Sequence, residues 1–498
     1  MAACGVDTEG EVSPTVDGGT SASSASSSTG GSSSTSSSSS SSGTSGTVDG
    51  GDASADAGTD ASKDGSADAD AGPPPGCLVD ADCKGGFCNT AQKCVAGQSC
   101  RGSANGPAGV ETCGTGEVGE ANAAHESCCK SLPLPVTTTR RLDKYEITGG
   151  RVRAFIDAVA AANAGVPDVR AWAKAYAAAN PTSQLGTVES GYPGLIDAVL
   201  PDHAGPNGAT PLPVHLGAFP MDPMNTLDGC FTSPGSQGHA TYWQDPADVA
   251  AFGVGTAGVR KYGREVLDTK AMNCVMPLML ATFCAWDGGE LARTADFKEV
   301  WGKRPVVLGN TTVYVPWAAI LPISQFNWRN GHGGNCPNFP WPGCVNTPPA
   351  FYTFPIDYVT LDDDTPVTAA PGRFAADVTA IVSANGEGWN DVGGNMMDMA
   401  WPSMAVNPGG SQIKNFCDTT ATPAGADIAC TRQGKQGVER FTGNLPHVAL
   451  VGYSFEGHNR RSEAYLAGNS ATIAAGDLKP VTFQYGKVGG RCARNVVP

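Results

Sequence analysis

The seventeen cysteines of this 498-residue chain constrain its fold more than any other feature. Four of them, Cys77, Cys83, Cys88 and Cys94, form a C-x5-C-x4-C-x5-C pattern in which few residues are hydrophobic. A segment this small cannot be stabilised by a buried core alone and needs cross-links. Disulfides fit better than zinc, because the gaps are longer than those of zinc motifs and no histidine lies nearby.

The other cysteines fit complete pairing apart from one near the N-terminus. After Cys4, sixteen cysteines remain, which is an even number. A second glycine-rich stretch contains Cys100, Cys113, Cys128 and Cys129. Eight more follow, at Cys230, Cys274, Cys284, Cys336, Cys344, Cys417, Cys430 and Cys492. Because disulfides persist in oxidising environments, we expect an extracytoplasmic protein, and the connectivity of its first eight paired cysteines stays open.

The first four residues, Met-Ala-Ala-Cys, resemble the end of a bacterial lipoprotein signal, in which two small residues precede a diacylated cysteine. We therefore expect residues 1–12 to be a lipoprotein-like N-terminus whose true start lies upstream. Cys4 would be lipidated and would anchor the protein at the bacterial outer membrane or cell surface. An ordinary cysteine near a frayed end is the alternative. The best apolar run, Val275–Trp286, is too short to span a bilayer, so membrane contact is expected only through the anchor.

Residues 13–76 form a low-complexity segment rich in serine, glycine and aspartate. Such a composition buries almost nothing, so it predicts a disordered linker that holds the rest of the chain away from a membrane. Residues 1–76 carry eleven acidic residues and one basic residue, which is most of the net charge of −16. This acidity opposes phosphate backbones and argues against a nucleic-acid partner.

The body, residues 132–498, follows a small disulfide-rich module at 77–131 and is expected to be an irregular, loop-rich α+β domain. Helical spacing of apolar residues and short runs of strand-forming residues are the signals. The predicted helices cover 151–163, 168–179, 277–285 and 294–300, and the predicted strands cover 312–315, 449–454 and 481–485. Glycine, proline and asparagine interrupt the chain elsewhere, which indicates many loops.

The segment Asp391–Asp398 contains the richest cluster of oxygen ligands. Two carboxylates and an amide lie within eight residues, and the glycines let the backbone turn its carbonyls inward. A hard cation such as Ca²⁺ is bound by such a set of oxygens. The alternative is an ordinary Asn/Gly/Asp turn before a strand. Residues 253–258 match GxGxxG, but no apolar strand precedes them, so they predict a loop.

Six blocks, in this order, resemble the formylglycine-generating enzyme (sulfatase-modifying factor) family. They are Leu142–Phe155, Met272–Val275, Ala281–Gly289, Tyr314–Trp317, Asp391–Met399 and Gly489–Arg494. The resemblance covers roughly residues 132–498, and the tethered, cysteine-rich lead-in is similar to that of bacterial lipoprotein members. It implies an irregular α+β fold related to C-type lectins.

The resemblance implies a structural role for calcium. In the family, the block that matches Asp391–Asp398 binds Ca²⁺. Carried over to this chain, the ligands are the side chains of Asp391 and Asp398 and the carbonyls of Val392, Gly394 and Met396.

The resemblance also pairs Cys284 with Cys492, which would tie a helix to the C-terminal segment. Our own expectation for the remaining body cysteines is Cys230–Cys274, Cys336–Cys344 and Cys417–Cys430. Closing so long a loop as that between Cys284 and Cys492 constrains the unfolded chain by several kcal/mol on the loop-entropy model.

Catalysis is where the chain departs from the family. The family's enzymes oxidise a substrate cysteine to formylglycine with O₂ and Cu(I), which two active-site cysteines hold. The corresponding positions here are Gly457 and Ser462. Cu(I) is soft and prefers thiolate, which neither residue supplies. We therefore expect no copper and no cysteine oxidation.

Two functions of different class remain. In the first, a monomeric, non-catalytic module binds a peptide or glycan in a cleft around Glu456, His458 and Arg460, with Asn459 and Arg461 beside them. A solvated polar loop is the alternative for these residues. In the second, the chain is an oxidoreductase of the sulfatase-modifying factor type that uses other metal ligands, with His458 as the candidate.

Overall fold

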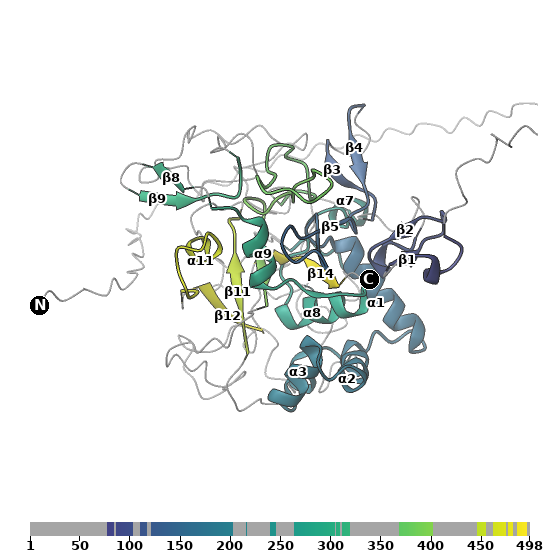
Figure 1. Ribbon diagram of the computed structural model, residues 1–498. Coiled ribbons are helices and arrows are strands. Elements are labelled where there is room, and N and C mark those ends of the chain that lie inside the picture. Colours follow the sequence, from purple (N-terminus) through teal and green to yellow (C-terminus); the bar gives the residue numbers. More distant parts are fainter. Residues whose placement is uncertain are drawn as a thin grey trace, which may run out of the picture. The chain divides into compact units, whose positions relative to one another are not determined.

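Figure 1 shows the computed structural model of the chain. The chain divides into two units, residues 1–70 and 71–498, and the residues described below all lie in the second. They are residues 77–83, 86–102, 110–116, 121–202, 216, 240–245, 263–303, 305–308, 311–318, 368–401, 446–454, 462–474, 477–481 and 486–495. Cys4, the predicted lipidation site, and the predicted linker lie outside these residues.

Two four-stranded sheets organise the body. The first has the order β12-β11-β10-β13, in which β10 runs parallel to β13 and the other pairs are antiparallel. Its strands are β10 (Met397–Ala400), β11 (His447–Val451), β12 (Leu478–Pro480) and β13 (Val488–Gly490). The second, β5-β6-β14-β7, is antiparallel throughout. Its strands are β5 (Ser131–Pro133), β6 (Arg140–Asp143), β7 (Glu290–Leu291) and β14 (Cys492–Asn495).

Only Arg491 separates β13 from β14, so one residue joins the two sheets. Short antiparallel pairs complete the strand structure of the described residues. They are β1 (Phe87–Cys88) with β2 (Cys94–Val95), β3 (Cys113–Thr115) with β4 (Ala124–Glu126), and β8 (Pro305–Leu308) with β9 (Thr311–Tyr314). Within the described ranges no sheet closes into a barrel, and the fold is a loop-rich mixture of helices and small sheets.

The two longest of the described helices, α1 and α2, begin at side chains that cap them. The hydroxyl of Thr148 accepts a hydrogen bond from the backbone N–H of Arg151, and Asp168 accepts one from Ala171, as N-cap residues do. The helices are α1 (Gly149–Ala162), α2 (Val169–Ala179), α3 (Gln184–Gly191), α4 (Leu195–Val199), α7 (Arg264–Leu267), α8 (Pro277–Trp286), α9 (Thr294–Val300) and α11 (Glu463–Leu466), and two 3₁₀ turns cover Asp80–Asp82 and Gln98–Cys100. None of the described helices combines the length and apolar character needed to cross a bilayer.

Helix α8 lies in the centre of the main hydrophobic core, and its side chains from Pro277 to Cys284 are all buried. The ring of Phe155 on α1 meets the ring of Phe283 on α8 edge-on, with centroids 6.1 Å apart. Cys284 on α8 forms a disulfide with Cys492 on β14, which is 208 residues further along the chain. This bond, the pair that the resemblance implies, fixes the central helix to the second sheet.

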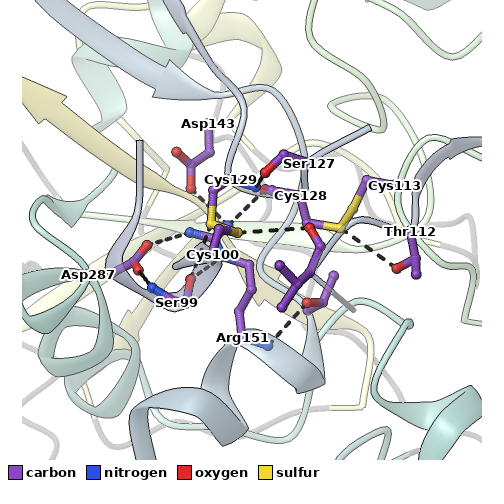
Figure 2. The surroundings of a disulfide bond; sticks show 12 residues. Ser99, Cys100, Thr112, Cys113, Ser127, Cys128, Cys129, Asp143, Arg151 and Asp287 are labelled. Atoms are coloured by element: carbon purple, nitrogen blue, oxygen red, sulfur yellow. Dashed lines mark hydrogen bonds and ion pairs between the residues drawn. A yellow bond between two sulfur atoms is a disulfide. The ribbon is translucent and has the colours of Figure 1, made fainter. Parts of the chain in front are cut away.

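Four more disulfides cross-link the cysteine-rich segment. They are Cys77–Cys88, Cys83–Cys94, Cys100–Cys129 and Cys113–Cys128. The adjacent residues Cys128 and Cys129 bond to different segments of the chain, Cys128 to Cys113 and Cys129 to Cys100, as Figure 2 shows. Cys274 is also disulfide-bonded. The other partners in the expected body pairs, Cys230, Cys336, Cys344, Cys417 and Cys430, lie outside the described residues.

Buried polar contacts join the cysteine-rich segment to the body. Arg151 on α1 is fully buried, and its guanidinium donates to the hydroxyl of Ser99 at 3.0 Å and to the carbonyl of Cys128 at 3.1 Å. The backbone N–H of Ser99 in turn donates to Asp287 Oδ1 at 2.6 Å. Figure 2 shows these groups together beside the Cys100–Cys129 disulfide.

The helices predicted from apolar spacing are present, with ends within two residues of those expected. The predicted strand at 312–315 corresponds to β9, and the one at 449–454 to the second half of β11. Of the strand predicted at 481–485 only Val481 is described, and it follows β12 as a turn residue, so β12 ends before the expected position.

Candidate functional site

The loop that precedes β10 carries the predicted calcium ligands. Asp391 and Asn395 both adopt left-handed backbone conformations, with φ of 55° and 58°. Their side chains hold the neighbouring segment: Asp391 Oδ2 accepts from the N–H of Gly372 at 2.5 Å, and Asn395 Oδ1 accepts from the N–H of Ala369 at 2.8 Å. The chain therefore turns before the strand, and the turn packs against residues 368–372.

A glycine in this loop allows close packing by an aromatic ring. A Cβ atom on Gly393 would lie 2.4 Å from the ring of Trp317, so only glycine fits. The Trp317 indole N–H donates to Asp377 Oδ1 at 2.7 Å. The loop thus brings a further carboxyl group toward the two predicted ligands.

Four acidic side chains, which we call the acidic cluster, surround this loop. They are Glu146, Asp377, Asp391 and Asp398, each with at most 1% of its surface exposed. Glu146 accepts from the Asn395 side-chain amide at 2.5 Å and from the N–H of Met396 at 3.2 Å.

One guanidinium forms an ion pair with a member of the acidic cluster among the described residues. Arg491 Nε lies 2.9 Å from Asp398 Oδ2, and Nη1 of the same side chain donates to the carbonyl of Lys144 at 2.8 Å. Because Arg491 is the single residue between β13 and β14, the link between the two sheets also carries this charge. Arg373 also acts electrostatically on Asp391, so two guanidinium groups act on a buried group of four acids.

Each of the two predicted calcium ligands in the acidic cluster has one carboxylate oxygen that is buried without a hydrogen-bond partner in the described part of the chain. They are Asp391 Oδ1 and Asp398 Oδ1. A buried, unsatisfied carboxylate oxygen carries a substantial desolvation cost. A cation bound between these oxygens would remove that cost, so the residues present fit the calcium ion that the resemblance implies.

The acidic cluster also perturbs its own ionisation. Burial raises the pKa of Asp391 to about 6, although Arg491 opposes the shift. Burial raises the pKa of Asp398 as well, and it raises the pKa values of Glu146 and Asp377 well above their ordinary range. Negative charge at this place is therefore costly unless a positive charge accompanies it.

The geometry limits how an ion is held. Among the described residues, no three carboxylates place one oxygen each within 4.8 Å of one another. An ion at this loop would take two carboxylates, from Asp391 and Asp398, and complete its shell with backbone carbonyls. Calcium accepts such mixed oxygen sets. The predicted carbonyl of Val392 faces Gly452, the residue after β11, since a Cβ atom on Gly452 would lie 2.6 Å from it.

The predicted copper position at Ser462 is occupied by a structural hydroxyl. Ser462 is buried at the start of α11, with a left-handed φ of 58°. Its Oγ donates to the carbonyl of Leu450 at 2.9 Å, and its N–H donates to Asp477 Oδ2 at 2.7 Å. The other predicted cleft residues, namely Glu456, Gly457, His458, Asn459, Arg460 and Arg461, lie outside the described residues.

Every cysteine in the described ranges is disulfide-bonded, so these ranges contain no free thiol. The sulfur atoms of Cys77, Cys83 and Cys94 lie within 4.8 Å of one another, but all three are in disulfides. They are therefore not metal ligands, in keeping with the disulfides expected from their spacing.

Sequence reasoning missed Glu146, Asp377 and Arg491 as members of this site. Glu146 and Arg491 lie within blocks that carry the family resemblance, so their blocks were a signal although their roles were not. Asp377 gave no signal, because it lies in an irregular stretch without a recognisable motif.

Comparison with known proteins gives little. No protein-family model matches the chain, and no curated protein matches it. Among solved structures, the chain is similar to PvdO from Pseudomonas aeruginosa, with 12% sequence identity and a TM-score of 0.27, over 78% of this chain and 92% of that one. A likeness this distant carries no functional conclusion.

Proposed function

We propose that this chain is a lipid-anchored cell-surface protein whose body is a non-catalytic, calcium-stabilised binding module related to formylglycine-generating enzymes and, through them, to the C-type lectin fold. The family part of the proposal rests on the six ordered sequence blocks. The observation that carries the calcium part is the pair of buried, unpartnered oxygens Asp391 Oδ1 and Asp398 Oδ1.

The proposed role of the calcium ion is structural. Bound by Asp391 and Asp398, it would add positive charge to a cluster of four buried acids on which Arg491 and Arg373 also act. It would also join the loop before β10 to the strand itself. Residues 368–372 pack on this loop through Gly372, so the ion would stabilise the junction of several irregular segments.

Loss of the family's oxidation chemistry is supported by what stands at the copper position. The Ser462 hydroxyl already donates its proton to Leu450, and a neutral hydroxyl binds Cu(I) poorly. The disulfides of the described cysteines leave no free thiol in those ranges. A peptide or glycan held near Glu456, His458 and Arg460 is the proposed ligand, and this part rests on sequence alone.

Copper binding and oxygen uptake test the non-catalytic assignment. The oxidised full chain is titrated with Cu(I) against a chromophoric copper chelator, and O₂ consumption is followed with a cysteine-containing peptide. We expect neither copper retention nor uptake above the peptide alone. The double variant Gly457→Cys/Ser462→Cys is the matched control, since it returns two thiols to the positions that the family uses. Stoichiometric copper with O₂ uptake by the unaltered chain would refute the assignment.

A further inference from the structure

A cavity of about 360 Å³ lies between the cysteine-rich segment and the second sheet. Its lining comes from β2 and the residues around it, from the start of β5, and from Arg141 on β6 and Arg494 on β14. Figure 1 labels β2, β5 and β14. The volume is in the range of small-molecule binding sites. The cavity is distinct from the acidic cluster, and no residue of that cluster lines it.

Two of the residues that line this cavity are arginines on neighbouring strands. Arg141 and Arg494 are directly opposite one another in the antiparallel pair of β6 and β14. Opposed residues in such a pair lie on the same face of the sheet, and like charges placed there are destabilising. A fold that keeps this pair therefore retains an unfavourable contact, which calls for a compensating negative charge.

The carboxylates nearby do not compensate both arginines. Arg494 forms ion pairs with Asp143 and with Asp287, the latter at 2.5 Å. Arg151 pairs with the same two aspartates, at 3.0 and 2.6 Å, as Figure 2 shows in part. Two aspartates are thus shared by two arginines, and the charge of Arg141 is surplus to this group.

Arg141 itself has polar contacts with Ser131 and no carboxylate partner among the described residues. Its Nε donates to the Ser131 hydroxyl at 3.0 Å, and its Nη2 donates to the Ser131 carbonyl. Burial and the neighbouring Arg494 lower the pKa of Arg141, and Asp143 opposes this only in part. The Nε of Arg494, which is 97% buried, also has no hydrogen-bond partner within the described ranges. The cavity is therefore lined by the unpaired positive charge of Arg141, and Arg494 lies beside it with an unsatisfied donor buried beneath the surface.

The one acidic residue of the lining is already neutralised. Glu126 accepts from Lys130 and from Lys144, each at 2.6 Å. Lys130 has a second partner in Glu387 at 2.6 Å. These groups balance one another, so they do not supply the charge that Arg141 lacks.

The part of the lining that β2 and its neighbours supply is largely apolar. It contains Val95, Ala96 and the two cysteines of the Cys83–Cys94 disulfide. A cavity lined by the guanidinium of Arg141 and by such an apolar surface suits an amphipathic anion, because a guanidinium binds carboxylate and phosphate oxygens in a planar, two-pronged geometry.

We propose that this cavity binds a small organic anion. Its carboxylate or phosphate group would lie against Arg141, in the positive field to which the neighbouring Arg494 contributes, and its apolar part against Val95 and the Cys83–Cys94 disulfide. The site does not depend on the proposed calcium site or on the proposed loss of catalysis, since it shares no residue with either.

The test uses three probes with the same apolar chain: hexanoate, hexyl phosphate and hexanol. Binding to the oxidised full chain is measured by calorimetric titration and by the shift in melting temperature. We expect hexanoate, hexyl phosphate or both to bind and to raise the melting temperature, and hexanol to do neither. The stronger of the two anions identifies the head group that the site prefers.

Two arginine variants locate the binding. Arg141→Gln removes the surplus charge, and we expect it to weaken binding of the better anion at least about tenfold. Arg293→Gln is the matched control, because Arg293 is exposed, pairs with Glu290 and does not line the cavity. It should leave the affinity unchanged.

The melting temperature of Arg141→Gln shows whether a loss of binding comes from the missing charge or from misfolding. Without ligand, Arg141→Gln should melt at or above the temperature of the unaltered chain, because it relieves the repulsion from Arg494. The proposal is overturned if neither anion binds better than hexanol, or if Arg141→Gln binds as well as the unaltered chain. A variant that melts clearly lower would also overturn it, since Arg141 would then be a paired structural charge.

Discussion

Replacing Asp391 by asparagine should leave the fold intact and abolish its response to calcium. Asp391 has a φ of 55°, a conformation that asparagine adopts readily. An asparagine carboxamide oxygen can also accept the hydrogen bond that Asp391 Oδ2 takes from Gly372 at 2.5 Å. The substitution therefore keeps the shape of the loop and exchanges a charged cation ligand for a neutral one.

The size of the calcium effect follows from mass action. An ion that binds only the folded state stabilises it by about 2.7 kcal/mol at about 100 times its Kd. For a unit of about 430 residues, residues 71–498, the unfolding entropy is about 0.9 kcal/mol/K. The unaltered chain should therefore melt about 3 °C higher in calcium than in excess chelator. The Asp391→Asn variant should show little of this shift.

The assay is scanning calorimetry of the oxidised full chain with chelator and with calcium. In chelator, Asp391→Asn should melt no lower than the unaltered chain, because it removes a buried negative charge, one oxygen of which accepts no hydrogen bond among the described residues. Asp157→Asn, on the exposed side of α1, is the control and should behave like the unaltered chain. The reasoning is wrong if calcium does not shift the unaltered chain, or if Asp391→Asn shifts equally.

Three further results are expected. Replacing both Cys284 and Cys492 by serine opens a loop whose ends are 208 residues apart, so the free energy of unfolding in urea should fall by about 5 kcal/mol; a loss under about 1 kcal/mol would contradict the loop-entropy argument. Arg151→Met removes one ion-pair partner from each of two buried aspartates and should lower the free energy of unfolding in urea by about 3–5 kcal/mol. An unchanged free energy of unfolding would show that these ion pairs do not stabilise the fold. Burial raises the pKa of Glu126, but hydrogen bonds from two lysines outweigh it and the net shift is downward. The stabilisation by ionised Glu126 is present above the ordinary glutamate pKa of 4.5 and is lost as the pH falls through the lower pKa of the folded state. The melting temperature of Glu126→Gln should therefore fall less steeply with decreasing pH than that of the unaltered chain. Equal slopes of melting temperature against pH would contradict this.

Local patterns predicted those helices whose own residues specify them. In α1, the apolar residues Val152, Phe155, Ile156 and Val159 are all buried, as their spacing indicated. Helix α3 gave no such signal, because it contains two glycines and its burial depends on distant contacts. The Gln184 side chain, for example, exchanges two hydrogen bonds with the backbone of Leu291.

The small sheets could not be predicted, because their pairings join distant segments. β14 pairs with β6, and their opposed residues Arg141 and Arg494 lie more than three hundred positions apart. A strand of three or four residues has too little sequence to specify such a partner. The arginine pair, and the cavity above it, follow from this register alone.

The candidate site shows the same division. Asp391 and Asp398 lie in one short motif, and the family resemblance of that motif made them candidate ligands. Glu146 and Asp377 reach the same loop only through the fold, so the excess of buried negative charge was not visible in the sequence. The pairing of the eight cysteines in the cysteine-rich segment could not be predicted either, since spacing alone permits many connectivities.

Elemental analysis of the purified, oxidised chain tests the central claim most directly. After dialysis against metal-free buffer, we expect about one calcium ion per unaltered chain and almost none in the Asp391→Asn variant. The copper content of both proteins should be equally low. Copper in a one-to-one ratio with the chain, or calcium equally low in both proteins, would contradict a calcium-stabilised module without the family's copper chemistry.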